Sequence, residues 1–304
     1  FRSNLNGRTS FLLQKMFEER KGRVKQVKKF NKKFLSVFFV MIALFVLGAC
    51  GKGDEQTQNE TKEVIFGVAP GPYGDMVTKA IKPGLEEKGY QVSVREFTDY
   101  IQPNNALANG EIQANLFQHT DYLETFRNDH NLDIEPIIVV PTLSMGIYSN
   151  KYQSLSELPD GATVAISNDP SNLARALQTL QDEGFIKIKE NLGATKATEK
   201  DIIENPKNLE IHSLESATLP RSIETVDIAL VPGNYAIAAN LDISSALAFE
   251  NQTERLKNVI AVRKEDVDSQ LGKDIIEVVK SDAFRAVMED PNDIFTEFGR
   301  PDWW

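Results

Sequence analysis

Short apolar runs alternate with helical patterns along most of this 304-residue chain, from Val64 onward. Strands are predicted at residues 64–69, 91–97, 112–117, 136–140, 163–166, 209–212, 227–231 and 259–262. Apolar residues at helical spacing separate most of these runs, and the first predicted helix has Asp75 as its N-cap. Strands that alternate with helices indicate an α/β fold with largely parallel sheets.

Two stretches indicate that the chain passes between two sheets. After the predicted strand at 136–140, residues 141–150 (PTLSMGIYSN) are again extended, with no helix between. On the way back, residues 227–241 (DIALVPGNYAIAANL) end a strand at a Pro-Gly pair. The length beyond residue 63 is enough for two hydrophobic cores. We therefore expect two lobes, the first formed by 64–143 and 236–304 and the second by 144–235.

The chain's only cysteine, Cys50, lies where an apolar run ends and a polar segment begins. Residues 34–49 carry no charge, and residues 20–33 before them hold basic residues and no acidic one. This order is typical of a secretory signal peptide, with a basic n-region and an apolar h-region. As a helix, the apolar run would span roughly 24 Å, less than the ~30 Å hydrocarbon core. A signal peptide therefore fits better than the alternative, a single membrane anchor.

Residues 47–50 (LGAC) resemble the lipobox of bacterial lipoproteins. The resemblance implies that the signal is removed before Cys50 and that a lipid on its thiol attaches the chain to a membrane. The alternative is an incidental or buried cysteine; with one cysteine, neither an intrachain disulfide nor a CxxC site can form. Residues 50–63 are predicted to be a flexible tether because 51–62 lack large apolar side chains. Residues 1–33 are predicted to be an upstream segment followed by the basic n-region, and residues 1–15, which precede the first methionine, Met16, are expected to be no part of the fold.

Charge divides the chain into two different parts. Residues 1–50 contain 11 Lys or Arg and 2 Asp or Glu, a net charge of +9. The rest of the chain contains 23 Lys or Arg and 42 Asp or Glu, a net charge of −19. A nucleic-acid surface needs clustered cations, which the acidic part lacks. We therefore predict no nucleic-acid partner and a well-solvated body.

Familiar catalytic and metal-binding motifs are absent from the sequence. It contains no G-x-S-x-G, no Walker loop, no G-x-G-x-x-G and no HExxH. Its three histidines, His119, His130 and His212, do not stand at metal-ligand spacing. We predict no enzyme activity, no cofactor and no metal.

The stretch NLFQHTDYLETF predicts part of a pocket. Phe117 and His119 share one side of a strand end, and Tyr122 follows at the predicted start of a helix. Taken singly, residues of these types are more often core or rim residues. Together they indicate an aromatic-lined pocket with one polar group, suited to an apolar side chain.

The stretch SNDPSNLARALQTL predicts a cationic group for the same pocket. Asp169 or Ser167 can cap a helix, and Arg175 lies about one turn inside it. The helix dipole disfavours a cation there, so a bound carboxylate would give the arginine a reason for its place. The alternative is a surface arginine paired with Asp182 or Glu183.

A third stretch, GVAPGPYGD, joins the first predicted strand to its helix. Backbone N–H groups at such a turn can bind an anion. A turn with structural demands only is the alternative, and the sequence leaves both open.

The chain resembles the NlpA-type methionine-binding lipoproteins, the substrate-binding components of ABC importers for methionine. The motifs that carry the resemblance cover about residues 64–290 in this order: VIFGVAPGPYGDM, NALANGEIQANLFQHTDYL, VAISNDPSNLARAL, DIIENPKNLEI, LPRSIETVDIALVPGNYAIAA and VIAVRKED. The resemblance implies a two-lobed periplasmic-binding-protein fold of type II. Each lobe is then a sheet flanked by helices, with a ligand cleft between the lobes.

The resemblance also implies a binding site. In it, Arg175 binds the α-carboxylate of methionine, and Asn234 and Asn258 hold the amino-acid head group. The methionine side chain is contacted by Tyr100, Phe117, His119 and Tyr122.

From these features we expect a lipid-anchored, extracytoplasmic monomer. It captures L-methionine and delivers it to the permease and ATPase of an ABC importer. The alternatives are a binder of another amino acid or of a methionine-containing dipeptide, a surface adhesin or antigen on the same fold, and an enzyme, for which only His119 would serve as a base.

Overall fold

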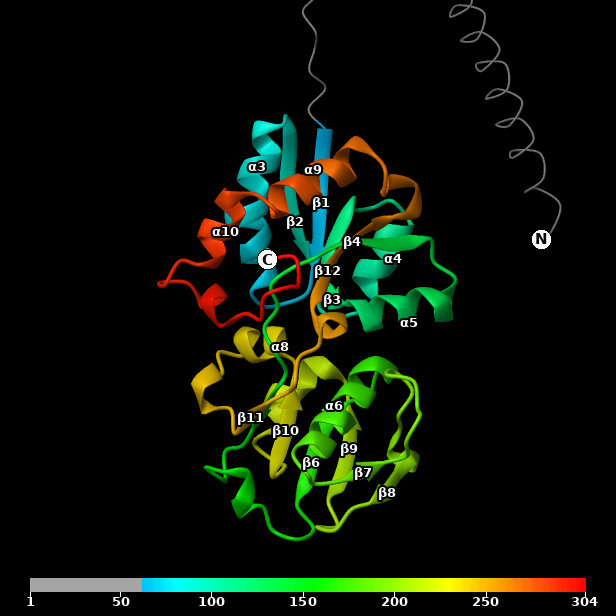
Figure 1. Ribbon diagram of the computed structural model, residues 1–304, viewed down its shortest axis with the longest axis vertical. Helices are drawn as coiled ribbons and strands as arrows, with labels where there is room; N and C mark the ends of the chain where they lie inside the picture. The colour runs from blue at the N-terminus through cyan, green and yellow to red at the C-terminus, as the bar shows by residue number, and fades with distance from the viewer. Residues whose placement is uncertain (1–61) are drawn as a thin grey trace, which may run out of the picture. The chain divides into compact units, whose positions relative to one another are not determined.

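Two five-stranded sheets organise residues 62–304, the part of the chain that the computed structural model describes (Figure 1). The first sheet has the order β2-β1-β3-β12-β4. Its strands are Lys62–Val68 (β1), Tyr90–Glu96 (β2), Ala114–His119 (β3), Ile134–Val139 (β4) and Asn258–Arg263 (β12). The predicted signal peptide, Cys50 and the predicted tether up to residue 61 lie outside the described residues.

The second sheet has the order β11-β5-β10-β6-β9. Its strands are Gly146–Tyr148 (β5), Thr163–Ser167 (β6), Glu210–Leu214 (β9), Ile228–Val231 (β10) and Ala248–Phe249 (β11). A separate two-stranded sheet pairs Lys187–Ile188 (β7) with Ile202–Glu204 (β8). Because β11 belongs to the second sheet, this sheet extends past residue 235, where we expect the second lobe to end.

Each of the eight predicted strands overlaps an observed one. The expectation of largely parallel sheets holds for four of the five strands in each sheet, which run in one direction, and fails for the fifth. In each five-stranded sheet, two neighbouring pairs are parallel and two are antiparallel. The reversed strands are β12 in the first sheet and β5 in the second. Each is the first strand after the chain enters that sheet from the other one, so it runs opposite to its neighbours.

Helices flank both sheets. Around the first sheet they are Tyr73–Met76 (α2), Lys82–Glu87 (α3), Gln102–Ala108 (α4), Thr120–His130 (α5), Gln270–Val279 (α9) and Asp282–Met288 (α10), with a π-helical turn at Val77–Ile81 that joins α2 to α3. Around the second sheet they are Pro170–Asp182 (α6), Leu219–Ser222 (α7) and Gly233–Ala238 (α8). Short 3₁₀ turns lie at Leu155–Glu157, Glu199–Asp201, Ser216–Thr218, Ile243–Ser245, Glu254–Leu256, Lys264–Asp266 and Ile294–Glu297. Among these described helices, none combines the length and apolar character needed to cross a membrane.

The first helix begins earlier than predicted. Pro72 is its N-cap, and Asp75 lies inside the first turn without capping it. Proline suits this place because its fixed φ matches the helix and its missing N–H costs no hydrogen bond there.

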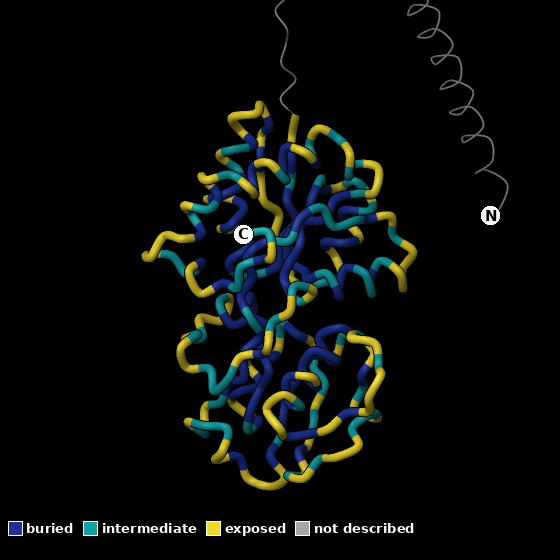
Figure 2. Tube along the Cα trace, viewed as in Figure 1, coloured by how far each residue is buried: buried dark blue, intermediate teal, exposed yellow. Residues whose placement is uncertain are grey.

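Each sheet has hydrophobic cores on both faces, because successive strand residues point to opposite sides. In β12, Ile260 and Val262 pack with helices α3, α9 and α10, whereas Val259 and Ala261 pack with α4 and α5. In β6, Val164 and Ile166 join one core and Ala165 the other. Figure 2 shows the buried strands inside each lobe and the exposed loops outside. The runs read as continuously apolar because both faces are covered.

Candidate functional site

The seven residues predicted to bind ligand line one cavity between the two sheets: Tyr100, Phe117, His119, Tyr122, Arg175, Asn234 and Asn258. They come from both lobes, with Phe117 and His119 on β3, Arg175 on α6 and Asn234 on α8. Asn258 is the first residue of β12 and lies opposite His119 on the neighbouring strand β3. The structure thus brings together residues far apart in sequence, and their role in binding stays a prediction.

Aromatic rings form one wall of this cavity. The ring centroids of Tyr100, Phe117 and Tyr122 lie 5.7 to 6.2 Å apart. The Tyr122 hydroxyl donates to the Tyr100 backbone carbonyl at 3.1 Å, which orients the Tyr122 ring. Such a wall offers apolar and polarisable surface to a ligand side chain.

His119 ends β3 and caps α5. Its Nδ1 accepts a hydrogen bond from the Tyr122 backbone N–H at 3.1 Å, so this nitrogen carries no proton. The proton therefore lies on Nε2, which donates to Asn172 Oδ1 at 3.1 Å. Burial, with help from the nearby charge of Arg175, lowers the pKa of His119 to about 3. The imidazole is neutral at physiological pH.

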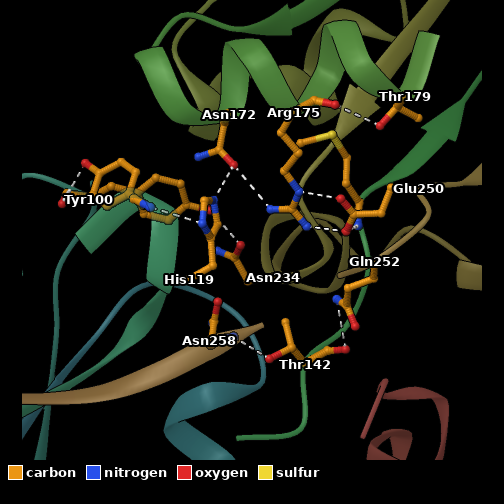
Figure 3. Close-up of polar contacts among 12 residues, drawn as sticks. Tyr100, His119, Thr142, Asn172, Arg175, Thr179, Asn234, Glu250, Gln252 and Asn258 are labelled. Atoms are coloured by element: carbon orange, nitrogen blue, oxygen red, sulfur yellow. Dashed lines mark hydrogen bonds and ion pairs between the residues drawn. The ribbon is translucent and has the colours of Figure 1, made fainter. Parts of the chain in front are cut away.

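Helix α6 presents Asn172 and Arg175. Of the two predicted caps, Asp169 and Ser167, the structure has Asp169 as the N-cap, which accepts from the Asn172 backbone N–H at 3.0 Å. The Asn172 amide nitrogen also donates to Asp169, which turns its oxygen toward His119 and Arg175. Arg175 Nη1 donates to this oxygen at 3.2 Å (Figure 3).

Arg175 is buried and its ion-pair partner is Glu250. The Nε and Nη2 groups donate to the two carboxylate oxygens in a fork. The alternative of a surface arginine paired with Asp182 or Glu183 is therefore wrong. Burial alone would lower the pKa of Arg175, but the charge and hydrogen bonds of Glu250 raise it above its usual value.

Asn234 links the lobes beside the cavity. Its side-chain oxygen accepts from the Tyr100 hydroxyl at 2.6 Å, and its side-chain nitrogen donates to the Pro70 carbonyl at 3.0 Å. Gly71 lies directly against the Asn234 backbone. The turn in GVAPGPYGD thus packs against α8, and Tyr73 after it lines the cavity.

Sequence reasoning missed several residues at this site. Tyr73, Asn172 and Thr142 line the cavity, and Glu250 holds Arg175 from outside it. Asn172 had a signal, since it begins the N-x-x-R pattern one helical turn before Arg175. Glu250 had none, because it lies 75 residues from its partner.

His119 is expected to make stability depend on pH. Its folded-state pKa of about 3 lies below the usual value of about 6.5, so between these values the unfolded chain binds more protons. Stability therefore falls as the pH is lowered through this window, by at most about 1.4 kcal/mol per pH unit from this group. His119→Gln cannot titrate and loses this part of the pH dependence.

Urea unfolding between about pH 7 and pH 4 measures this difference. His212→Gln is the matched control, because His212 is exposed. The interpretation fails if both variants keep the slope of the original chain.

Comparison with known proteins agrees with this architecture. The model of the NlpA lipoprotein family matches residues 64–297. The D-methionine-binding lipoprotein MetQ of Salmonella typhimurium is 35% identical over 269 residues, which cover 88% of this chain and 96% of that protein. MetQ of Escherichia coli K12 is 34% identical over 269 residues, which again cover 88% of this chain and 96% of that protein.

A solved structure is also similar. A nutrient-binding protein from Burkholderia cenocepacia bound to methionine superimposes with a TM-score of 0.71 at 39% identity, covering 75% of this chain and 95% of that one. The family model spans both sheets and every cavity residue described above. This chain therefore belongs to the NlpA lipoprotein family.

Proposed function

We propose that this chain is the substrate-binding lipoprotein of an ABC importer and that its ligand is methionine. The observation that carries the proposal is that Arg175 and the aromatic rings of Tyr100, Phe117 and Tyr122 line the same cavity. A guanidinium suits a carboxylate, and aromatic rings suit a flexible apolar side chain with a sulfur atom. The names of the relatives, which refer to methionine, support this choice.

The proposed pose follows from these groups. The α-carboxylate accepts hydrogen bonds from N–H groups of Arg175, and the thioether side chain packs on the aromatic wall. Burial of that side chain contributes roughly 1.5–3 kcal/mol. Asn234 and Asn258 receive the amino-acid head group. The two ring nitrogens of His119 are already bonded to Tyr122 and Asn172, so its neutral ring offers van der Waals contact only.

We propose that ligand binding closes the lobes. Hydrogen bonds already join them at His119 to Asn172, Tyr100 to Asn234 and Asn234 to Pro70. We place the first lobe at 62–143 and 250–304 and the second at 144–249, because β11 pairs within the second sheet. Closure converts occupancy into a shape that the permease recognises.

We further propose that the mature protein is a monomer anchored outside the membrane by a lipid on Cys50. It delivers its ligand to the permease and ATPase of the importer. Mass spectrometry of the membrane-extracted protein tests the anchor, since Cys50→Ala should remain unprocessed and without lipid.

The ligand is tested with residues 51–304, which include every described residue. The protein is unfolded and refolded to remove co-purified ligand, then titrated by calorimetry with L-methionine, D-methionine and glycyl-methionine. The family resemblance of the motifs leads us to expect L-methionine, whereas the two MetQ relatives are named for D-methionine. Binding of neither enantiomer would overturn the proposed ligand, and heat with the dipeptide alone would move it to a peptide.

We also propose that the chain catalyses no reaction. Incubation with amides and esters of methionine should give no turnover above the buffer rate. Turnover that is lost in His119→Gln would contradict this.

A further inference from the structure

Glu250 connects the candidate site to both chain segments that run between the sheets. It follows β11 on the segment that leads to β12. Its backbone N–H donates to the Met145 carbonyl at 3.0 Å, and its carboxylate accepts from the Met145 N–H at 2.8 Å. Met145 lies on the other segment, between β4 and β5. Glu250 is thus held where the two segments lie side by side.

The carboxylate of Glu250 holds Arg175 from outside the cavity. Arg175 lines the cavity and Glu250 does not. The side chains are only 6% and 2% exposed, so the pair is shielded from water. Of the five guanidinium N–H groups, two donate to Glu250 and one to Asn172. One N–H on Nη1 and one on Nη2 have no partner among residues 62–304 and remain for a ligand.

The ion pair also sets the charge of the cavity. Arg175 is the only charged residue among those that line it, because His119 is neutral. Without Glu250, a buried guanidinium would favour any anion. With Glu250, the pair is neutral, and a ligand of zero net charge preserves that balance. A ligand with a carboxylate and no amino group would add one uncompensated negative charge.

We propose that Glu250 is a positioning residue that makes this site select zwitterionic amino acids over carboxylates that lack an amino group. It does so by holding the guanidinium by one edge and by cancelling its charge. The inference rests on the proposed function, in which Arg175 receives the ligand carboxylate. It defines the ligand class by charge, independently of the side chain that the aromatic wall accepts.

The test compares methionine with 2-hydroxy-4-(methylthio)butanoate, which carries a hydroxyl in place of the ammonium group. Calorimetry should show that the original chain binds its preferred enantiomer of methionine at least about 100-fold more tightly than the hydroxy analogue. Glu250→Gln keeps the shape of the side chain and removes its charge. This variant should reduce the ratio of the two affinities on the order of tenfold or more. A unit charge several ångströms from the ligand changes its binding affinity by about that factor in a protein site.

Two further variants separate charge from position. Glu250→Asp keeps the charge and shortens the reach, so it should weaken both ligands and preserve their ratio. Asp274→Asn is the matched control, because Asp274 is a buried carboxylate that bonds to Tyr90 and does not line the cavity. It should leave the ratio unchanged.

An unchanged ratio in folded Glu250→Gln would overturn the inference. So would equal affinities of the original chain for the two ligands, a measurement that needs no variant and decides the matter if Glu250→Gln does not fold. Failure of the proposed function would differ, because the original chain would then bind neither enantiomer of methionine.

Discussion

Replacing Arg175 by alanine is expected to weaken methionine binding at least about 100-fold, because the ligand carboxylate loses its charged donors. The change also leaves Glu250 buried without a counter-charge. Breaking a buried ion pair in this way costs roughly 3–5 kcal/mol of folding free energy. Calorimetry measures the binding, and thermal unfolding followed by circular dichroism measures the stability.

Arg255→Ala is the matched control for this prediction. Arg255 also forms ion pairs, with Asp121 and Glu124, but it is half exposed and does not line the cavity. Its loss should change affinity little. It should cost less stability than Arg175→Ala, because the Arg255 guanidinium and Glu124 are exposed and only the Asp121 end of this network is buried. A folded Arg175→Ala protein whose affinity stays within about threefold of the original would show that the carboxylate is bound elsewhere.

Replacing Gly71 by alanine is expected to weaken binding about tenfold or more by opposing lobe closure. A Cβ on Gly71 would lie 2.5 Å from the Asn234 carbonyl oxygen and 2.9 Å from its Cα. These are backbone atoms of α8, which cannot move away as a flexible side chain can. The hydrogen bond from Asn234 to Pro70 would then break. Calorimetry gives the affinity, and small-angle scattering shows whether methionine still compacts the protein.

Gly89→Ala controls for backbone strain. Gly71 and Gly89 have φ values of +122° and +87°, which disfavour any residue with a Cβ, but a Cβ on Gly89 meets no atom within 4 Å. Strain at either position should cost stability on the order of 1–2 kcal/mol. Only Gly71→Ala should lose affinity. Equal affinities of the two variants would show that this contact does not limit closure.

Local patterns were sufficient to predict much of the fold and four of the residues that line the cavity: Phe117, His119, Tyr122 and Arg175. The strand and helix periods predicted eight strands that the structure contains, because burial on both faces leaves a continuous apolar run. The cap at Asp169 was readable because capping depends on a few adjacent residues. The motifs around Phe117 and Arg175 marked the two kinds of surface that meet in the cavity.

Strand direction and long-range pairing were not readable in this way. The reversal of β5 and β12 depends on where the chain enters each sheet, and no residue within either strand encodes that. The two-residue strand β11 is too short for a period, so the extent of the second sheet was missed. Cys50 and its lipid stay a prediction, since they lie outside the described residues.

By itself, then, the sequence determined the α/β class, the order of most elements and the chemical character of the site, since each depends on neighbouring residues. Only the tertiary structure decided what Arg175 faces. Its partner Glu250 lies 75 residues away and is brought to it by the two segments that join the sheets. The physical reason is that a buried charge must be neutralised by whichever group the fold places beside it, and separation along the chain does not limit that choice.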